Sequence, residues 1–105
     1  MYVRVGYFVG DVSDANRSRF ERGLRDDIMP MVARLPGVID ARLMWGREYE
    51  DRAPRVHAAI MLSFASPEAV QVALASPGRT AMRGKLAELL PLFDGYITHV
   101  NFAVD

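Results

Sequence analysis

The sequence predicts one α+β domain over residues 1–105, in which helices cover one face of a four-stranded antiparallel sheet. Three observations support this fold class. The chain of 105 residues is long enough for one compact core. Hydrophobic residues make up 50% and charged residues 25%, as in ordinary globular proteins, which excludes disordered and fibrous classes. Four segments with strand-like patterns alternate with two amphipathic helical regions in the order βαββαβ.

The chain has no formal net charge, because thirteen Lys and Arg residues balance thirteen Asp and Glu residues. A neutral chain lacks the positive field that attracts nucleic acid or an anionic membrane, so neither partner is expected. The absence of cysteine excludes disulfides and cysteine-based metal sites. Two histidines make a poor metal site and no cofactor motif is present, so we expect no metal and no cofactor. No segment resembles a secretory signal or a membrane helix, which predicts a cytoplasmic protein.

The first third of the chain predicts a strand followed by a long helix. Residues 2–9 are β-branched and aromatic, as in a strand. Ser13 or Asp14 is a suitable N-cap for the helix that follows. Apolar residues then recur at spacings of 4, 4, 3 and 4, as in a helix that faces a core: Phe20, Leu24, Ile28, Met31 and Leu35. Pro30 should kink this helix or end its first segment, and Pro36-Gly37 should end the helix.

The rest of the chain predicts a hairpin, two helical pieces and a last strand. Residues 38–49 and 56–64 alternate as strands, and the charged residues 47–54 form the tip of their hairpin. Ser66-Pro67-Glu68 begins a short helix that ends before Ser76-Pro77. A second helical piece carries the apolar residues Met82, Leu86, Leu89, Leu90 and Phe93. Asp94-Gly95 then turns the chain into a strand over residues 96–104.

Right-handed crossovers place both helical regions on the same face of this sheet, and the more apolar face is the one we expect them to cover. That face is predicted to contain Val3, Val5, Tyr7, Val9, Ile39, Leu43, Trp45, Val56, Ile60, Leu62, Phe64, Val100, Phe102 and Val104. The other face is mixed and is predicted to contain Tyr2, Phe8, Met44 and Met61 with Arg4, Arg42, His57, Ser63, His99 and Asn101. Because large apolar patches are unusual on monomers, this second face predicts a homodimer.

This arrangement, with two stretches of sequence, resembles the EthD-like family of dimeric α+β barrel proteins, which have a ferredoxin-like fold. In the first stretch Phe20, Pro30-Met31-Val32 and Leu35-Pro36-Gly37 are similar to the family's spacing. In the second, residues 64–69 and 73–78 are similar to the family's strand end and its "Ala-Ser-Pro-Glu" helix. Family members often have tyrosine and tryptophan where this chain has Gly23 and Leu24. The resemblance covers nearly the whole chain.

The EthD-like family is implicated in the breakdown of ethers and related xenobiotics, and the wider superfamily includes monooxygenases, isomerases, dehydratases and haem enzymes. The resemblance implies a homodimer that acts on or binds a small apolar organic compound in a catabolic or secondary-metabolic pathway. Two alternatives stay open, namely a cofactor-free oxidoreductase, isomerase or lyase and a non-catalytic ligand-binding or partner-stabilising protein. Ile28 stands where the family often has a histidine, which permits the second alternative and suggests substrate contact for Ile28 rather than proton transfer.

The two histidines are the best candidates for proton transfer, because imidazole changes charge near neutral pH. We expect His57 and His99 on one sheet face with Arg4 and Asn101, and the first strand between the third and the last. Such a cluster could hold an enolate-like oxygen, with Arg4 as the electrostatic partner and a histidine as the base. Alternatively, both histidines are hydrogen-bonded polar groups within the dimer interface.

A second candidate site lies between the sheet and the helices. Tyr7 and Trp45 are expected on the helix-facing side and could line a substrate pocket there, with Tyr7 as a third catalytic candidate. Methionines at positions 29, 31 and 82 could supply its apolar wall. The alternative is that all of these side chains are ordinary core packing.

Overall fold

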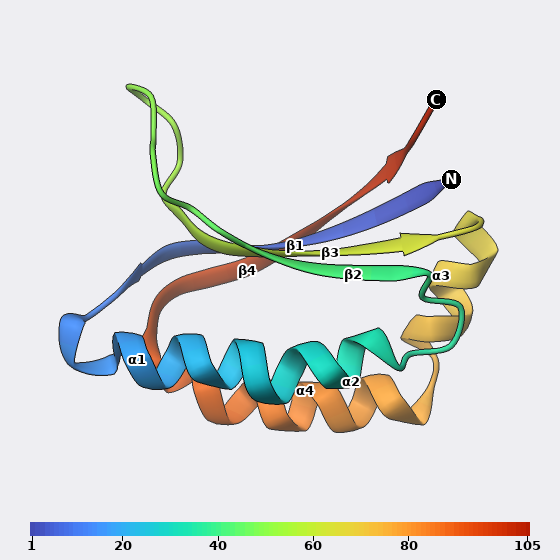
Figure 1. Ribbon diagram of the computed structural model, residues 1–105, viewed down its shortest axis with the longest axis horizontal. Coiled ribbons are helices and arrows are strands. Elements are labelled where there is room, and N and C mark those ends of the chain that lie inside the picture. The colour runs from blue at the N-terminus through green and yellow to red at the C-terminus, as the bar shows by residue number, and fades with distance from the viewer.

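The computed structural model describes residues 1–105 as a four-stranded antiparallel sheet with all helices on one face (Figure 1). The strands lie in the order β2-β3-β1-β4, with β1 in the interior of the sheet. Their bounds are Tyr2–Val12 for β1, Asp40–Trp45 for β2, Val56–Phe64 for β3 and Phe93–Ala103 for β4. The βαββαβ order, the ferredoxin-like fold class and the place of β1 between β3 and β4 are therefore confirmed.

The first helical region is one rod that changes its pitch in the middle. It consists of α1 (Asp14–Arg22), a π-helical segment (Gly23–Ile28) and α2 (Met29–Ala33). Ser13 caps α1, since its hydroxyl accepts a hydrogen bond from the backbone N–H of Asn16 at 3.3 Å. The helix continues past Pro30 as α2, and the irregularity near this proline is the π-helical segment that precedes it.

The wider turns change which side chains reach the core. Phe20, Leu24, Ile28, Val32 and Leu35 are buried, whereas Met31 is partly exposed. The prediction that Met31 faces the core is wrong. A π-helical turn contains more residues than an α-helical turn, so residues four positions apart stay on the same face.

The second helical region is divided as predicted, with small differences at its end. Its parts are α3 (Pro67–Leu74), α4 (Pro77–Leu89) and a single 3₁₀ turn (Leu90–Leu92). Phe93 begins β4 instead of closing the helix, and Leu90 is 40% exposed instead of buried. No helix of the chain combines the length and the apolar character that crossing a bilayer would require.

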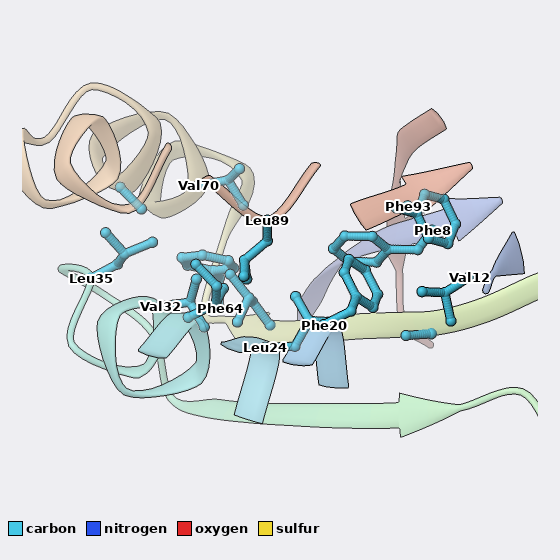
Figure 2. Packing of buried hydrophobic residues seen from close by; sticks show 14 residues of the cluster. Phe8, Val12, Phe20, Leu24, Val32, Leu35, Phe64, Val70, Leu89 and Phe93 are labelled. Atoms are coloured by element: carbon cyan, nitrogen blue, oxygen red, sulfur yellow. The ribbon is translucent and has the colours of Figure 1, made fainter. Parts of the chain in front are cut away.

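The main core lies between the sheet and the helices. Figure 2 shows three aromatic rings gathered toward one end of it, with Val32 and Phe64 toward the other. Phe20 stacks on Phe93 with ring centroids 5.2 Å apart, and Phe8 meets both rings edge-on at 5.8 and 6.0 Å. These contacts fix the end of the sheet where α1 begins.

The pairing of β1 with β3 decides which side chains of β1 face the helices. Ile60, Leu62 and Phe64 of β3 face them, as predicted. Arg4 pairs with Leu62 and Gly6 pairs with Ile60, so the even-numbered residues of β1 share that face. The sequence therefore assigned the faces correctly for β2 and for residues 58–64 of β3, and inversely for β1, β4 and His57 of β3.

Alternation alone could not decide this point, because both faces of β1 carry large apolar residues. Phe8 decides it, since only the helix side offers it the rings of Phe20 and Phe93. The helix-covered face contains Tyr2, Arg4, Phe8, His99 and Asn101, and the open face contains Val3, Val5, Tyr7, Val9, Val100 and Phe102. Ile39 and Val104 lie outside the strands and are 60% and 49% exposed, so they do not belong to the covered face.

The open face of the sheet has an apolar centre. Val3, Val5 and Ala59 are buried there against the partly exposed side chains of Tyr7 and Met61. Three further side chains around them, Met44, Val100 and Phe102, are each 42% exposed. The hairpin loop of residues 46–55 rises on this side of the sheet, away from the helices (Figure 1).

Candidate functional site

A cavity of about 470 Å³ lies between the sheet and the helices. Fourteen of its nineteen lining residues are hydrophobic. The apolar walls come from β1, β3, β4, α2, α3, α4 and the segments around them, and include Phe8, Ile28, Val32, Leu62, Phe64, Met82, Leu86 and Ile97. A cavity of this size and character suits an organic molecule of one or two rings.

The cavity exists because α4 does not lie flat on the sheet. α4 packs mainly against α2 and the π-helical segment, and makes few contacts with the strands. β4 is the edge strand next to β1, and its residues Ile97 and His99 form one wall opposite the α4 residues Arg79, Met82 and Arg83. A space therefore remains between β4 and α4, and this space is the cavity.

The polar groups of the cavity are all basic. Arg4 and His99 reach it from the sheet, whereas Arg79 and Arg83 reach it from α4, and no Asp or Glu lines it. Arg4 is held in place by Asn101, because its Nη1 donates a hydrogen bond to the Oδ1 atom at 3.0 Å. The predicted cluster of Arg4, His99 and Asn101 is therefore brought together, on the helix-covered face instead of the open one.

The ring of His99 lies directly over Gly6. A Cβ atom on Gly6 would stand 3.1 Å from both Cδ2 and Nε2 of His99, which is tighter than nearly all such contacts. Gly6 therefore makes room for the imidazole, and any larger residue would push the ring away from its present position.

His99 is exposed at the rim of the cavity. Its partial burial, followed by the nearby charges of Arg4 and Arg79, lowers the pKa of His99 below its ordinary value. The imidazole is therefore neutral at pH 7, with one ring nitrogen able to accept a proton and the other able to donate a hydrogen bond. Burial and the charge of Arg79 also lower the pKa of Arg4. The guanidinium remains protonated, since arginine titrates far above neutral pH.

His57 does not join His99. The pairing of β1 with β3 shifts between Phe8 and Val9, and the His57 ring lies on the helix side, outside the cavity lining. Its Nε2 atom is 3.0 Å from Oε2 of Glu21, and both side chains are largely buried, at 13% and 18% exposed. The predicted pair of histidines on the open face is therefore wrong.

The surroundings of His57 are aromatic. Its ring lies 5.9, 6.1 and 6.3 Å from those of Phe20, Trp45 and Phe93. The guanidinium groups of Arg25 and Arg47 lie over the Trp45 ring at 5.6 and 6.0 Å. Trp45 faces the helices as predicted but does not line the cavity.

The other predicted pocket residues separate into two groups. Ile28 lines the cavity and is 1% exposed, and Met82 lines it too. Tyr7 packs with Val3, Val5 and Ala59 on the open face, so its expected place between sheet and helices is wrong. Met29 packs against the core away from the cavity, and Met31 does not line it.

The two arginines of α4 are not among the site residues predicted from the sequence. Arg79 and Arg83 stand seven and three positions before Leu86 along the stripe that also carries Met82 and Leu90. Cations four residues apart on an otherwise apolar helix face are the signal that could have identified them.

The depressed pKa of His99 gives the folded protein a pH dependence. The unfolded chain binds a proton at this residue near pH 6.5, whereas the folded chain binds it only at lower pH. The contribution of His99 to the free energy of unfolding is therefore complete above about pH 6.5. It is lost as the pH falls through the pKa of the folded state. We expect NMR titration to show His99 with a midpoint below the usual value, and Arg79→Gln to raise it. A midpoint at or above that of an exposed histidine would contradict this.

No protein-family model matches the chain, and no curated protein matches it. Solved structures do share its fold. An EthD family protein from Bacillus halodurans superposes with a TM-score of 0.80 at 12% identity, covering 100% of both chains. SnoaB, a cofactor-independent oxygenase from Streptomyces nogalater, gives 0.64 at 22% identity, covering 98% of this chain and 91% of that one. A dimeric protein of unknown function with a ferredoxin-like fold from Bacteroides fragilis gives 0.66 at 14%, covering 98% and 96%. The expected resemblance to the EthD family is thus confirmed in the fold.

Proposed function

We propose that the protein binds a compact apolar organic molecule in the cavity between β4 and α4, and that His99 exchanges a proton with it. One observation supports this above all. A neutral imidazole stands between cationic side chains at the rim of an otherwise apolar cavity. Apolar walls with a few convergent polar groups are typical of small-molecule sites.

The chemistry that this arrangement favours is removal of a proton next to a carbonyl or from a phenol. The lone pair of an imidazole nitrogen takes the proton, and the electron pair left behind spreads onto oxygen as an enolate or phenolate. Arg4 stabilises that oxygen, because its guanidinium is already in place and partly removed from water. Return of the same proton to a different carbon completes an isomerisation with no net change of oxidation state.

An oxygenase reaction would start from the same anion, with O₂ as the second substrate that accepts its electrons. The fold shared with SnoaB, which is described as a cofactor-independent oxygenase, supports this variant of the proposal. In both variants the residues of this chain have the same roles. His99 takes the proton, Arg4 stabilises the charge on oxygen, and the apolar walls exclude water.

A non-catalytic binding protein is the second candidate function. It is favoured by the absence of any carboxylate from the cavity lining, since a catalytic histidine is usually oriented by one. The two candidates differ in what His99 contributes. It is essential for turnover in the first and contributes only polar contact in the second.

We further propose that the protein is a homodimer through the open face of its sheet. The apolar centre around Val5 and Met61 and the half-exposed side chains of Val100 and Phe102 support this. A patch of that kind is unusual on a monomer. In a two-fold symmetric dimer, the same patch of a second copy would cover it. The Bacteroides fragilis structure, which is described as dimeric, shares the fold.

Filling the cavity should abolish binding without unfolding the chain. Ala87 is exposed on α4 and lines the cavity, so Ala87→Trp places an indole ring in the space that a ligand would occupy. We expect naphthalene and 2-naphthol to raise the melting temperature of the wild-type protein but not that of the variant. A ligand at about 100 times its Kd adds about 2.7 kcal/mol to the free energy of unfolding, which a thermal-shift assay detects readily.

Ala81→Trp is the matched control, because Ala81 is also exposed on α4 but does not line the cavity. It should leave the ligand-induced shift unchanged. If Ala87→Trp keeps the full shift, the ligand binds elsewhere and the proposed site is wrong.

A further inference from the structure

The charges that surround the cavity identify the kind of molecule that it accepts. We propose that the ligand is an apolar organic acid with a single carboxylate, and that Arg79 and Arg83 of α4 bind this carboxylate. This inference rests on the proposed function of the cavity and adds the class of ligand to it.

The first argument is that the cavity holds cations without counter-ions. Arg4, Arg79 and Arg83 all line it, and no Asp or Glu does. The basic side chains that form ion pairs in this chain are others, namely Arg17, Arg42, Arg55, His57 and Lys85. The side-chain partner of Arg4 is the neutral amide of Asn101. Three guanidinium groups thus share one cavity in a chain whose total charge is zero.

The second argument is the position of Arg79 in its helix. It lies in the first turn of α4, where the helix dipole favours anions and disfavours cations, and where α4 has no acidic residue. Its Nη1 atom donates a hydrogen bond to the carbonyl oxygen of Leu74 at 3.3 Å, which holds the side chain at the end of α3. A guanidinium has five N–H donors, so others remain for a ligand.

The third argument is that these groups repel one another in the empty cavity. The charge of Arg79 is close enough to lower the pKa of both Arg4 and His99. A bound anion would remove this repulsion, because it is attracted by every one of the cations. The cavity is therefore complementary to an anion before any ligand binds.

A monocarboxylate on an apolar body fits better than a phosphate or a dicarboxylate. Fourteen of the nineteen lining residues are hydrophobic, and the cations lie on the sides formed by β1 and α4. One planar carboxylate matches the forked geometry of a guanidinium, and the rest of the molecule occupies the apolar space. Binding of the carboxylate by the α4 arginines leaves Arg4 and His99 for the reacting part of the ligand.

The test compares two probes of nearly equal shape, 2-naphthoate and the neutral 2-naphthamide. We expect isothermal titration calorimetry at about pH 7.5 to show the acid binding at least about tenfold more tightly than the amide, since hydrogen bonds to charged groups are the stronger ones. Added salt should weaken the binding of the acid only. Arg79→Gln and Arg83→Gln should each weaken the acid about tenfold and leave the amide unchanged.

Arg34→Gln is the matched control, because Arg34 is exposed at the end of α2 and does not line the cavity. It should change the affinity for neither probe. If Arg79→Gln fails to fold, Arg83→Gln and the comparison of the two probes on the wild-type protein still decide the question, since Arg83 is exposed.

The outcomes separate this inference from the proposed function. If the amide binds as tightly as the acid, the cavity is a small-molecule site but the inference of an anionic ligand is wrong. If naphthalene, the amide and the acid all fail to bind, the proposed function is wrong and the inference fails with it. If the acid binds more tightly but both arginine variants retain full affinity, Arg79 and Arg83 are not its binding residues.

Discussion

Phe102→Asp is expected to convert the proposed dimer into a well-folded monomer. Phe102 lies on the open face, where it pairs with Val3 across β1 and β4, and it is 42% exposed in the single chain. The monomer therefore loses little when this side chain is replaced. In the dimer, by contrast, the new carboxylate would be unpaired in an apolar interface. Because the dimer is two-fold symmetric, each subunit contributes one such carboxylate.

An unpaired charge in an interface costs about 2–5 kcal/mol, so two of them should raise the dimer dissociation constant at least about a thousandfold. Sedimentation equilibrium over a range of concentrations measures this directly. Val72→Asp is the control, since Val72 is 60% exposed on α3, on the helical side of the molecule, and its replacement should leave the dimer intact. A wild-type chain that sediments as a monomer at micromolar concentration would contradict the proposed dimer.

His99→Gln is expected to reduce turnover of a proton-transfer substrate by about 10²–10⁴-fold, while the affinity for a non-reacting ligand changes little. Glutamine retains a hydrogen-bonding group of similar reach but accepts no proton. The expected pattern is therefore a large loss in kcat with a small change in KM, measured by steady-state kinetics on an enolisable aromatic ketone.

His57→Gln is the matched histidine control. His57 contacts Glu21 and the aromatic rings near it, and it lies outside the cavity lining. We expect this variant to be less stable than the wild-type protein and to retain its kcat. Equal activity of the wild-type and His99→Gln proteins would leave the non-catalytic binding protein as the better interpretation.

The same cationic groups have two effects in this mechanism. Arg4 and Arg79 add to the effect of burial in lowering the pKa of His99, which keeps the imidazole unprotonated before a ligand binds. They also lower the pKa of any acidic C–H or O–H group bound beside them, because they stabilise its conjugate base. We infer that a negative charge on the ligand weakens the first effect once it binds, so that His99 becomes a stronger base.

The cavity lies within one chain, on the side of the sheet away from the proposed dimer interface. Alternation in the sequence predicts Arg4, His99 and Asn101 on the dimer face instead. The structure keeps these residues together but moves the site, so substitutions on the open face should affect assembly more than ligand binding.

Several features could be predicted because they depend on short stretches of chain. The bounds of β3, the Ser13 cap and the division of the second helical region follow from alternation, capping residues and proline positions. The cluster of Arg4, His99 and Asn101 could also be predicted, since strand order and alternation alone bring them to one face.

The sequence by itself determined the fold class, the element order and that Arg4, His99 and Asn101 share a face. The tertiary structure alone decided which face of β1 and β4 the helices cover, because both faces are apolar and only the packing of Phe8 on Phe20 and Phe93 distinguishes them. It also decided that His57 lies on the helix side beside Glu21, since the shift in strand pairing after Phe8 is invisible in an alternating pattern. Arg79 and Arg83 reach the site through the docking of α4, which depends on contacts between residues far apart in the chain.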